Sequence, residues 1–365
     1  MTEERKYIYS IIKNPKETQT SGTFRLSEAI FGINNRDILL VPYRDIAAVV
    51  SNTHFINFDK LDKKELTQLI AVHDQVNADL MKKHDVIPMR FGMVAENIEE
   101  IRNILRKAYI QFKAALERIA GKAEFVVQVF WNEKNILEKL IQENPEIQEL
   151  KKETESKGKI LGLASKMKLG KCIFEALELY RKECREDILR NLATRFPDFS
   201  AGKLLDTNKE KEMIMNYSFL IGRGQELELE SALNQIAEKY KDGLKFKYIG
   251  PMAPYSFTVI NLSLGNFDLV DNARKTLGLG ESAALLEIRN SYRKLVHEYH
   301  PDKHEYKKDQ VILEEAVKKM KNIVTANEVL TVYCKHYLSA LSSEKEQLCS
   351  FRKEDVEDSI IIKGE

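Results

Sequence analysis

The stretch "SYRKLVHEYHPDKHEYKKD" at residues 291–309 decides how the C-terminal part of this chain folds. Within it and just upstream, apolar residues recur at spacings of 3 and 4, which predicts an amphipathic helix over residues 284–299. The helix is expected to end at His300, because the residue before a proline is disfavoured in the α-helical region. The apolar stripe consists of Leu285, Ile288, Tyr292, Leu295 and Tyr299.

One flank of the predicted helix is basic, although the helix as a whole is nearly neutral. At about 100° per residue, Arg293 and Lys294 fall on one side of the helix and Arg289 lies at its border. Pro301 has a fixed φ and no N–H, so it presents Asp302 at a rigid corner. A solvated helix face followed by a turn would show the same pattern, so the surrounding sequence has to decide between the two interpretations.

The surrounding segment resembles a J domain, the module of the DnaJ co-chaperones. Residues 273–309 read "ARKTLGLGESAALLEIRNSYRKLVHEYHPDKHEYKKD", and "AVKKMKNIVTANEVL" at residues 316–330 resembles the helix that follows in that module. The resemblance implies an all-α domain, itself not an enzyme, that binds a DnaK-class chaperone ATPase and triggers ATP hydrolysis on it. The chaperone-binding residues that it implies are Arg289, Arg293, Lys294, His300, Pro301, Asp302 and Lys303.

Composition excludes several classes of protein. The net charge of the 365 residues is +1, so the chain as a whole lacks the basic excess of a nucleic-acid-binding protein. The four cysteines form no CxxC pair, and no zinc spacing appears, so we expect reduced thiols and no metal or cofactor. No signal peptide or membrane-spanning apolar run is present, which favours a cytoplasmic protein with no membrane partner.

Strand and helix patterns alternate through the first 265 residues. Strands are expected at residues 6–12, within 37–51, and at 85–94 and 124–131, with helices at 61–84 and 96–120; we interpret them as one split βαβ sheet covered by two helices. A helical middle and a second mixed part follow, with a strand expected at 255–264. The fold class is therefore α+β, and the predicted domains are residues 1–132, 133–265 and 266–345, with a tail at 346–365 that is either frayed or a docked strand.

Two short motifs in this part call for explanation. In "IPMRFGMV", Arg90 lies within an apolar run, so we expect a buried guanidinium paired with an acidic residue. In "YIGPMAPYSFTVI", glycine and two prolines predict a shaped corner between strands. No catalytic triad, Cys-His pair or carboxylate pair stands out, so we do not expect an enzyme.

These motifs together resemble the gas vesicle protein GvpF/GvpL family over about residues 5–262. The matching pieces also include "KYIYSI", "DIAAVVS", "LIAVHDQV", "GKAEFVVQVFW" and "MNYSFLI". The resemblance implies a two-part accessory protein, ferredoxin-like in its N-terminal part, that contacts the shell protein GvpA. The motif residues, structural or shell-binding, are Pro88, Arg90, Phe91, Gly92, Gly250, Pro251, Pro254, Tyr255, Ser256 and Phe257.

The sequence thus favours a gas vesicle assembly factor that binds the apolar shell protein and recruits a DnaK-class chaperone through its J domain. Two alternatives stay open. The J-like segment could be a degenerate docking domain of a structural gas vesicle component. The chain could also be a general J-domain co-chaperone with another client.

Overall fold

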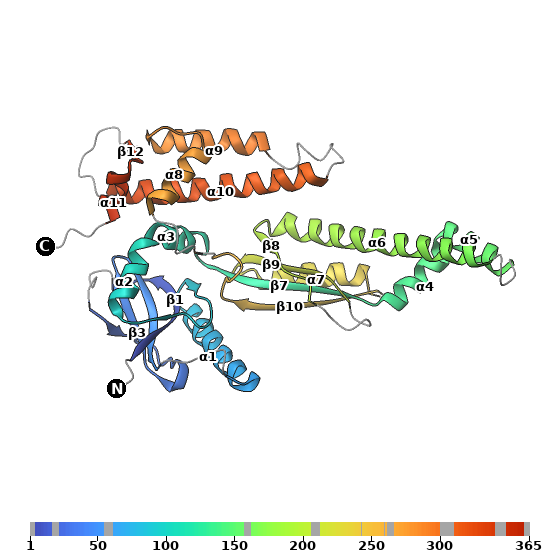
Figure 1. Ribbon diagram of the computed structural model, residues 1–365, viewed down its shortest axis with the longest axis horizontal. Coiled ribbons are helices and arrows are strands. Elements are labelled where there is room, and N and C mark those ends of the chain that lie inside the picture. The colour runs from blue at the N-terminus through green and yellow to red at the C-terminus, as the bar shows by residue number, and fades with distance from the viewer. Residues whose placement is uncertain are drawn as a thin grey trace. The chain divides into compact units, whose positions relative to one another are not determined.

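The computed structural model describes residues 4–16, 22–54, 61–156, 162–205, 212–241, 243–258, 260, 266–299, 310–339 and 348–360. Over these residues the chain is a mixed α+β protein with antiparallel sheets and a helical C-terminal segment, as predicted (Figure 1). It divides into two compact units, of which unit 1 comprises residues 1–120 and 258–365, and unit 2 comprises residues 121–257. The predicted domain limits stay predictions, because these units are defined by contacts and not by independent folding.

The sheet of unit 1 has the strand order β2-β3-β4-β1-β5, and β6 also pairs with β1. Its interior strand β1, between β4 and β5, is buried from Tyr7 to Ile12, which explains the continuous apolar sequence of that strand. The strands are β1 (Arg5–Lys13), β2 (Phe24–Arg25), β3 (Ile38–Tyr43), β4 (Ile46–Thr53), β5 (Val86–Pro88) and β6 (Val94–Ala95), with a short 3-10 helix η1 (Ile33–Asn35).

The α-helices of unit 1 in the described residues before 120 are α1 (Lys63–Met81), α2 (Ile98–Lys107) and α3 (Tyr109–Arg118). A capping box between Asp62 and Glu65 starts α1. The single helix expected over residues 96–120 is wrong, since the backbone breaks at the buried Ala108. At this break the Asn266 side chain accepts a hydrogen bond from the Ile110 amide and donates one to the Arg106 carbonyl, so a distant residue satisfies the interrupted backbone.

Unit 2 contains a sheet of order β10-β7-β9-β8. The strand predicted at residues 124–131 belongs here, as β7, so its assignment to the first sheet is wrong; it pairs with β9 on one side and β10 on the other. The strands are β7 (Lys122–Trp131), β8 (Phe199–Ala201), β9 (Glu212–Gly222) and β10 (Leu244–Met252), and the helices are α4 (Glu133–Glu143), α5 (Pro145–Ser156), α6 (Gly162–Arg195) and α7 (Glu226–Lys239).

The strand expected at residues 255–264 is not found where the structure describes the chain. Residues 255–257 form a turn after β10, and residues 259 and 261–265 lie outside the described part. The prolines on either side of Met252 and Ala253 limit the donors available for a strand ladder, which favours the turn.

The C-terminal segment belongs to unit 1. Its elements are α8 (Asn266–Thr276), β11 (Ser282–Ala283), α9 (Leu285–Tyr299), α10 (Gln310–Ser339), β12 (Cys349–Ser350) and α11 (Lys353–Ile360). Helix α9 begins and ends close to the predicted limits, and α8 and α10 pack on α3 (Figure 1). The described part of the tail, residues 348–360, is docked, since β12 pairs with β11 and α11 packs on α8 and α10.

Candidate functional site

The basic flank of α9 is exposed, as the helical pattern predicted. Arg289, Arg293 and Lys294 are all exposed, whereas Ile288 on the apolar stripe is buried. A groove of about 380 Å³ runs between α9 and α10, and its basic lining residues are Arg289, Arg293 and Lys335. This arrangement offers positive charge beside an apolar floor, which suits an acidic partner surface.

The His-Pro-Asp corner makes up the rest of the predicted chaperone-binding set. His300, Pro301, Asp302 and Lys303 lie outside the described residues. Helix α9 is described up to Tyr299, one residue before the corner. The basic flank and the entry into the corner are therefore the described parts of the predicted chaperone-binding set.

The J-like segment is joined to the N-terminal part by specific polar contacts. Asn266 is buried and bridges the break between α2 and α3, with donor–acceptor distances of 3.3 Å to the Ile110 amide and 3.0 Å to the Arg106 carbonyl. Lys335 of α10 forms an ion pair of 3.6 Å with Glu117 of α3. Contacts near both ends of α3 therefore join the J-like segment to the N-terminal part of unit 1.

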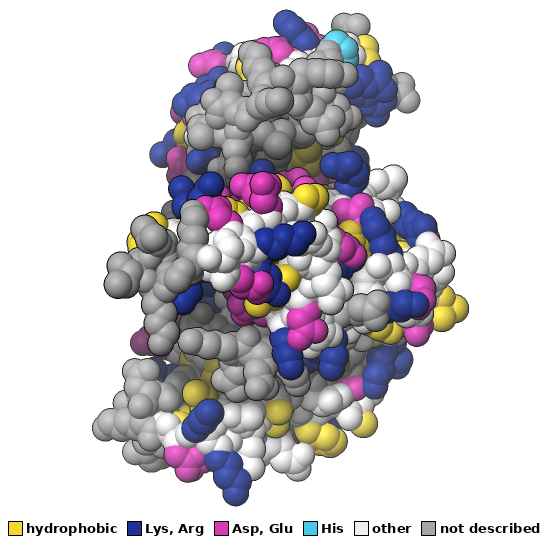
Figure 2. All heavy atoms as spheres, turned by 90° about the vertical axis from the view of Figure 1, so that its right-hand side faces the viewer, with side chains coloured by type: hydrophobic (Ala, Val, Ile, Leu, Met, Phe, Trp, Pro, Cys, Tyr) yellow, Lys and Arg dark blue, Asp and Glu magenta, His cyan; other side chains and the backbone are white. Residues whose placement is uncertain are grey.

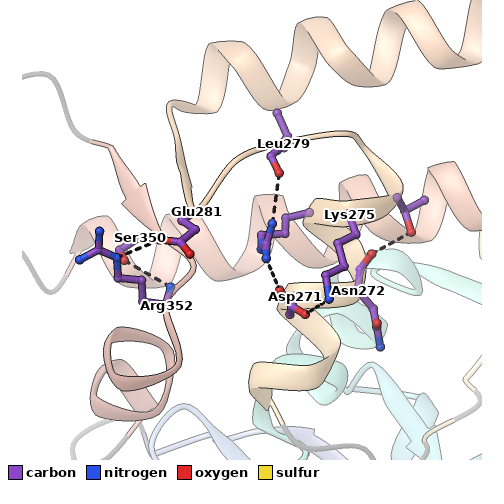
Figure 3. Close-up of polar contacts among 9 residues, drawn as sticks. Asp271, Asn272, Lys275, Leu279, Glu281, Ser350 and Arg352 are labelled. Atoms are coloured by element: carbon purple, nitrogen blue, oxygen red, sulfur yellow. Dashed lines mark hydrogen bonds and ion pairs between the residues drawn. The ribbon is translucent and has the colours of Figure 1, made fainter.

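Polar contacts also shape the turn between α8 and α9 (Figure 3). Asp271 forms ion pairs of 2.6 Å with both Arg274 and Lys275, and Arg274 donates to the Leu279 carbonyl. Gly278 has φ +67, which only glycine adopts readily, so a turn at Leu277-Gly278 ends α8.

The docked tail forms a strap, residues 348–360, across the J-like segment. Cys349 and Phe351 are buried, and the Tyr333 hydroxyl donates to the Ser350 carbonyl at 2.5 Å. Arg352 forms an exposed ion pair of 3.3 Å with Glu281 (Figure 3). The hydrogen bond with the Cys349 thiol, together with burial, raises the pKa of Cys334, so the Cys334 thiol stays protonated.

The "PMRFG" motif forms a turn in unit 1 after β5. Pro88 is buried and Phe91 is half-buried, but Arg90 is exposed, so the expected buried guanidinium is wrong. The physical reason is that Arg90 follows the end of β5, where its side chain reaches solvent. The Tyr7 hydroxyl accepts a hydrogen bond from the Gly92 amide at 3.0 Å, which links this turn to strand β1.

A buried histidine supports the same turn. The two ring nitrogens of His73 contact the Tyr7 hydroxyl at 3.0 Å and the Met89 carbonyl at 3.1 Å. Burial lowers the pKa of His73 below its usual value, so the ring is neutral. A neutral ring that donates to Met89 and accepts from Tyr7 satisfies both contacts.

The "GPMAPYSF" motif is anchored on β7 in unit 2. The buried Glu124 carboxylate accepts hydrogen bonds from the Ser256 amide and hydroxyl at 2.8 and 2.6 Å, and the Ser256 hydroxyl lies 3.0 Å from that of Ser218. Gly250 has φ +157, and a Cβ there would come within 2.5 Å of the Phe125 ring. Pro254 and Phe257 are buried, Pro251 is exposed and Tyr255 is half-buried. The motif therefore has a structural role in forming this corner.

Sequence reasoning missed three residues that hold these sites together: His73, Glu124 and Asn266. His73 and Glu124 carried a weak signal, since each is a polar residue within an apolar pattern on a helix or strand. Asn266 carried none, because its partners lie about 160 residues away in the sequence.

The described residues contain neither a helix suited to crossing a membrane nor a group of three or more His, Cys, Asp or Glu residues that could hold a metal. Figure 2 shows Lys and Arg side chains interspersed with Asp and Glu over one face of the molecule. This mixing agrees with the charge pattern of the sequence.

Comparisons with known proteins match both parts of the chain. Residues 5–259 match the family model of the gas vesicle synthesis protein GvpL/GvpF, and residues 274–335 match the DnaJ domain. Gas vesicle protein F of Haloferax mediterranei is 25% identical over 228 residues, covering 62% of this chain and 83% of that protein. Gas vesicle protein F of Dolichospermum flosaquae is 26% identical over 177 residues, covering 48% of this chain and 70% of that protein.

Solved structures show the same fold. Crystal structures of GvpF from an Anabaena species and from Microcystis aeruginosa give TM-scores of 0.58 and 0.52, at 19% and 20% identity. They cover 71% and 70% of this chain and 99% of their own chains. Because the family model matches most of the length of this chain, the chain belongs to the gas vesicle synthesis protein GvpL/GvpF family and carries a DnaJ domain after the family region.

Proposed function

We propose that this chain assists gas vesicle assembly by binding the apolar shell protein GvpA and by recruiting a DnaK-class chaperone ATPase through its DnaJ domain. The proposal is for a cytoplasmic, vesicle-associated accessory protein without catalytic activity of its own. The observation that carries it is the attachment of the DnaJ domain, through Asn266 and Lys335, to the N-terminal part of the gas vesicle family region, with the basic flank of α9 exposed.

The physical reason for joining the two parts is concentration. Free subunits of an apolar shell expose large apolar surfaces and aggregate. A factor that holds such a subunit and carries a chaperone recruiter in the same chain raises the effective concentration of the chaperone next to its client. Such recruitment needs only a small, transient contact.

Exposed apolar residues on α6 support the client-binding part of the proposal. Met167 and Phe174 are 72% and 64% exposed, and they lie seven residues apart, so they share one face of the helix. Apolar side chains exposed on one helix face are a surface that an apolar subunit can cover.

The chaperone part is tested by steady-state ATP turnover of a purified DnaK-class chaperone. The full chain should stimulate turnover, and His300→Gln should abolish the stimulation. The double change Arg293→Glu with Lys294→Glu should weaken it, and added salt should mimic that loss, because exposed charges are screened over about 10 Å at 0.1 M salt. Lys63→Glu with Lys64→Glu, at exposed positions of α1, is the matched control and should leave stimulation unchanged. Absence of stimulation by the full chain would favour the degenerate docking domain.

The client part is tested by co-expression with GvpA. The full chain should keep GvpA in the supernatant and co-purify with it. Met167→Gln with Phe174→Gln should reduce this, whereas Leu227→Gln, at another highly exposed apolar position, is the matched control. If GvpA sediments equally with and without the chain, the client is another protein, and the general co-chaperone alternative takes its place.

A further inference from the structure

Strand β10 has an edge that no other described strand covers. The strand spans Leu244–Met252 at one end of the sheet of unit 2 and pairs with β7 alone among the described residues. In such an edge strand, main-chain N–H and C=O groups of alternate residues point away from the sheet and can pair with another extended chain.

A groove runs alongside this edge. It has a volume of about 540 Å³ between α7 and β10, and its apolar residues are Leu233 and Ala237 of α7 with Leu244, Phe246 and Tyr248 of β10. The β10 residues in the groove pair with buried residues of β7, so the groove lies on the helix-covered face of the sheet. Alternate side chains of a strand added to this edge would enter it.

The opposite face of β10 is positively charged. Lys245 and Lys247 are exposed, and they pair across the sheet with Phe130 and Gln128, which carry no charge. On the groove side, Lys241 is paired with Glu238 at 3.1 Å. The remaining acidic residue lining the groove is Glu230, which is exposed on α7.

We propose that the β10 edge and the α7 groove bind an extended segment of a partner protein that is apolar at alternate positions and acidic between them. Main-chain hydrogen bonds to the edge give affinity, apolar side chains fill the groove, and acidic side chains on the other face lie beside Lys245 and Lys247. A second copy of this chain fits less well, because antiparallel pairing of two β10 edges would bring lysines opposite lysines. This inference does not depend on the DnaJ domain or on GvpA.

The simpler interpretation of Lys245 and Lys247 is that they prevent any strand from pairing with this edge, since lysines on edge strands often have this role. The two interpretations differ in one respect. A guarded edge rejects every added strand, whereas the proposed edge accepts an acidic strand and rejects a basic one.

The test uses a capped, fluorescein-labelled peptide of nine alternating valine and glutamate residues, with binding to the full chain measured by fluorescence anisotropy. Saturable binding is expected, and it should be about tenfold weaker when lysine replaces glutamate, because two cross-strand charge pairs change sign. Two further peptides carry N-methyl groups at the odd or the even positions. One of them should lose binding, since only one set of amides faces the edge.

Protein variants locate the contact. Lys245→Glu with Lys247→Glu should reverse the preference to the lysine peptide, and Ala237→Trp should weaken binding by filling the groove. Lys166→Glu with Lys168→Glu, exposed on α6, is the charge-matched control and should leave binding unchanged. Circular dichroism checks that each variant is folded.

Three results would overturn the proposal. One is the absence of saturable binding up to about 1 mM peptide, the weak limit of specific recognition. Another is equal binding of both charged peptides. The last is concentration-dependent self-association of the unmodified chain that Lys245→Glu with Lys247→Glu alters, which would assign the edge to a second copy.

Discussion

At the scale of single residues, His73 links stability to pH. Its pKa is lowered from 6.5 by burial in the folded chain, so below about pH 6.5 the unfolded chain binds a proton that the folded chain does not. The free energy of unfolding should therefore fall as pH drops from 7 towards 5, by up to about 1.4 kcal/mol per pH unit from this group. Urea unfolding followed by circular dichroism at several pH values measures this slope.

The control separates His73 from the other titrating groups. Removing its titration with His73→Gln should flatten the slope, whereas His54→Gln, at an exposed position, should leave the slope as it is. If His73→Gln does not fold, Tyr7→Phe offers a second measurement, because it removes the hydroxyl that contacts the ring and should change the apparent pKa. Parallel slopes in all the folded variants would show that carboxylates alone set the pH dependence.

The two family motifs should respond differently to substitution. Arg90 is exposed, so Arg90→Ala should change the free energy of unfolding by less than about 0.5 kcal/mol. Glu124→Ala should destabilise the chain more, by about 1–3 kcal/mol, because it removes two hydrogen bonds from Ser256 to a buried carboxylate. Thermal and urea unfolding measure both changes. Loss of vesicle formation by a fully stable Arg90→Ala chain would make that arginine part of a binding surface, whereas a strongly destabilised one would contradict its exposed position.

At the scale of elements, the strap is the part whose role the sequence left undecided. Phe351 is 1% exposed and packs near Tyr333, with ring centroids 6.1 Å apart. Phe351→Ala should therefore destabilise the DnaJ segment by about 3–5 kcal/mol. Arg352→Ala is the neighbouring control, because its ion pair is exposed and such pairs contribute at most about 1 kcal/mol. Hydrogen exchange of α8 and α10 gives the readout, and equal protection in the two variants would mean that the strap is not needed.

At the scale of the whole molecule, removal of the DnaJ segment should make the rest of unit 1 less stable, because the contacts between that segment and α3 are lost. A chain truncated after residue 265 should still fold, as the strand and helix pattern predicted, but without Asn266 at the break in α2–α3. The one tryptophan, Trp131, lies in unit 2 and reports on that unit. Its fluorescence transition should shift less than the transition seen by circular dichroism. An insoluble or non-cooperative truncated chain would show that the two parts fold only together.

The sequence by itself determined the fold class, the family and those local elements whose pattern is set within a few residues. Helix α9 and its exposed basic flank follow from spacing, because side-chain periodicity acts within a few residues. The α+β class follows from the strand and helix patterns, and the match to both families follows from short motifs that occur in the expected order along the chain.

Only the tertiary structure decided which elements share a sheet and which polar residues hold the motifs. Strand β7 belongs to the second sheet. Its pairing residues, such as Phe219, lie far along the chain, and the sequence of a strand does not specify which strand it pairs with. Arg90 is exposed because it follows the end of β5. The position of that strand end, and not the apolar composition of residues 87–94, sets the direction of the Arg90 side chain. Asn266 satisfies backbone groups at the break between α2 and α3 from about 160 residues away, and residues 348–360 dock through the pairing of β12 with β11. These are long-range contacts, whose energy depends on three-dimensional packing that local sequence patterns do not encode.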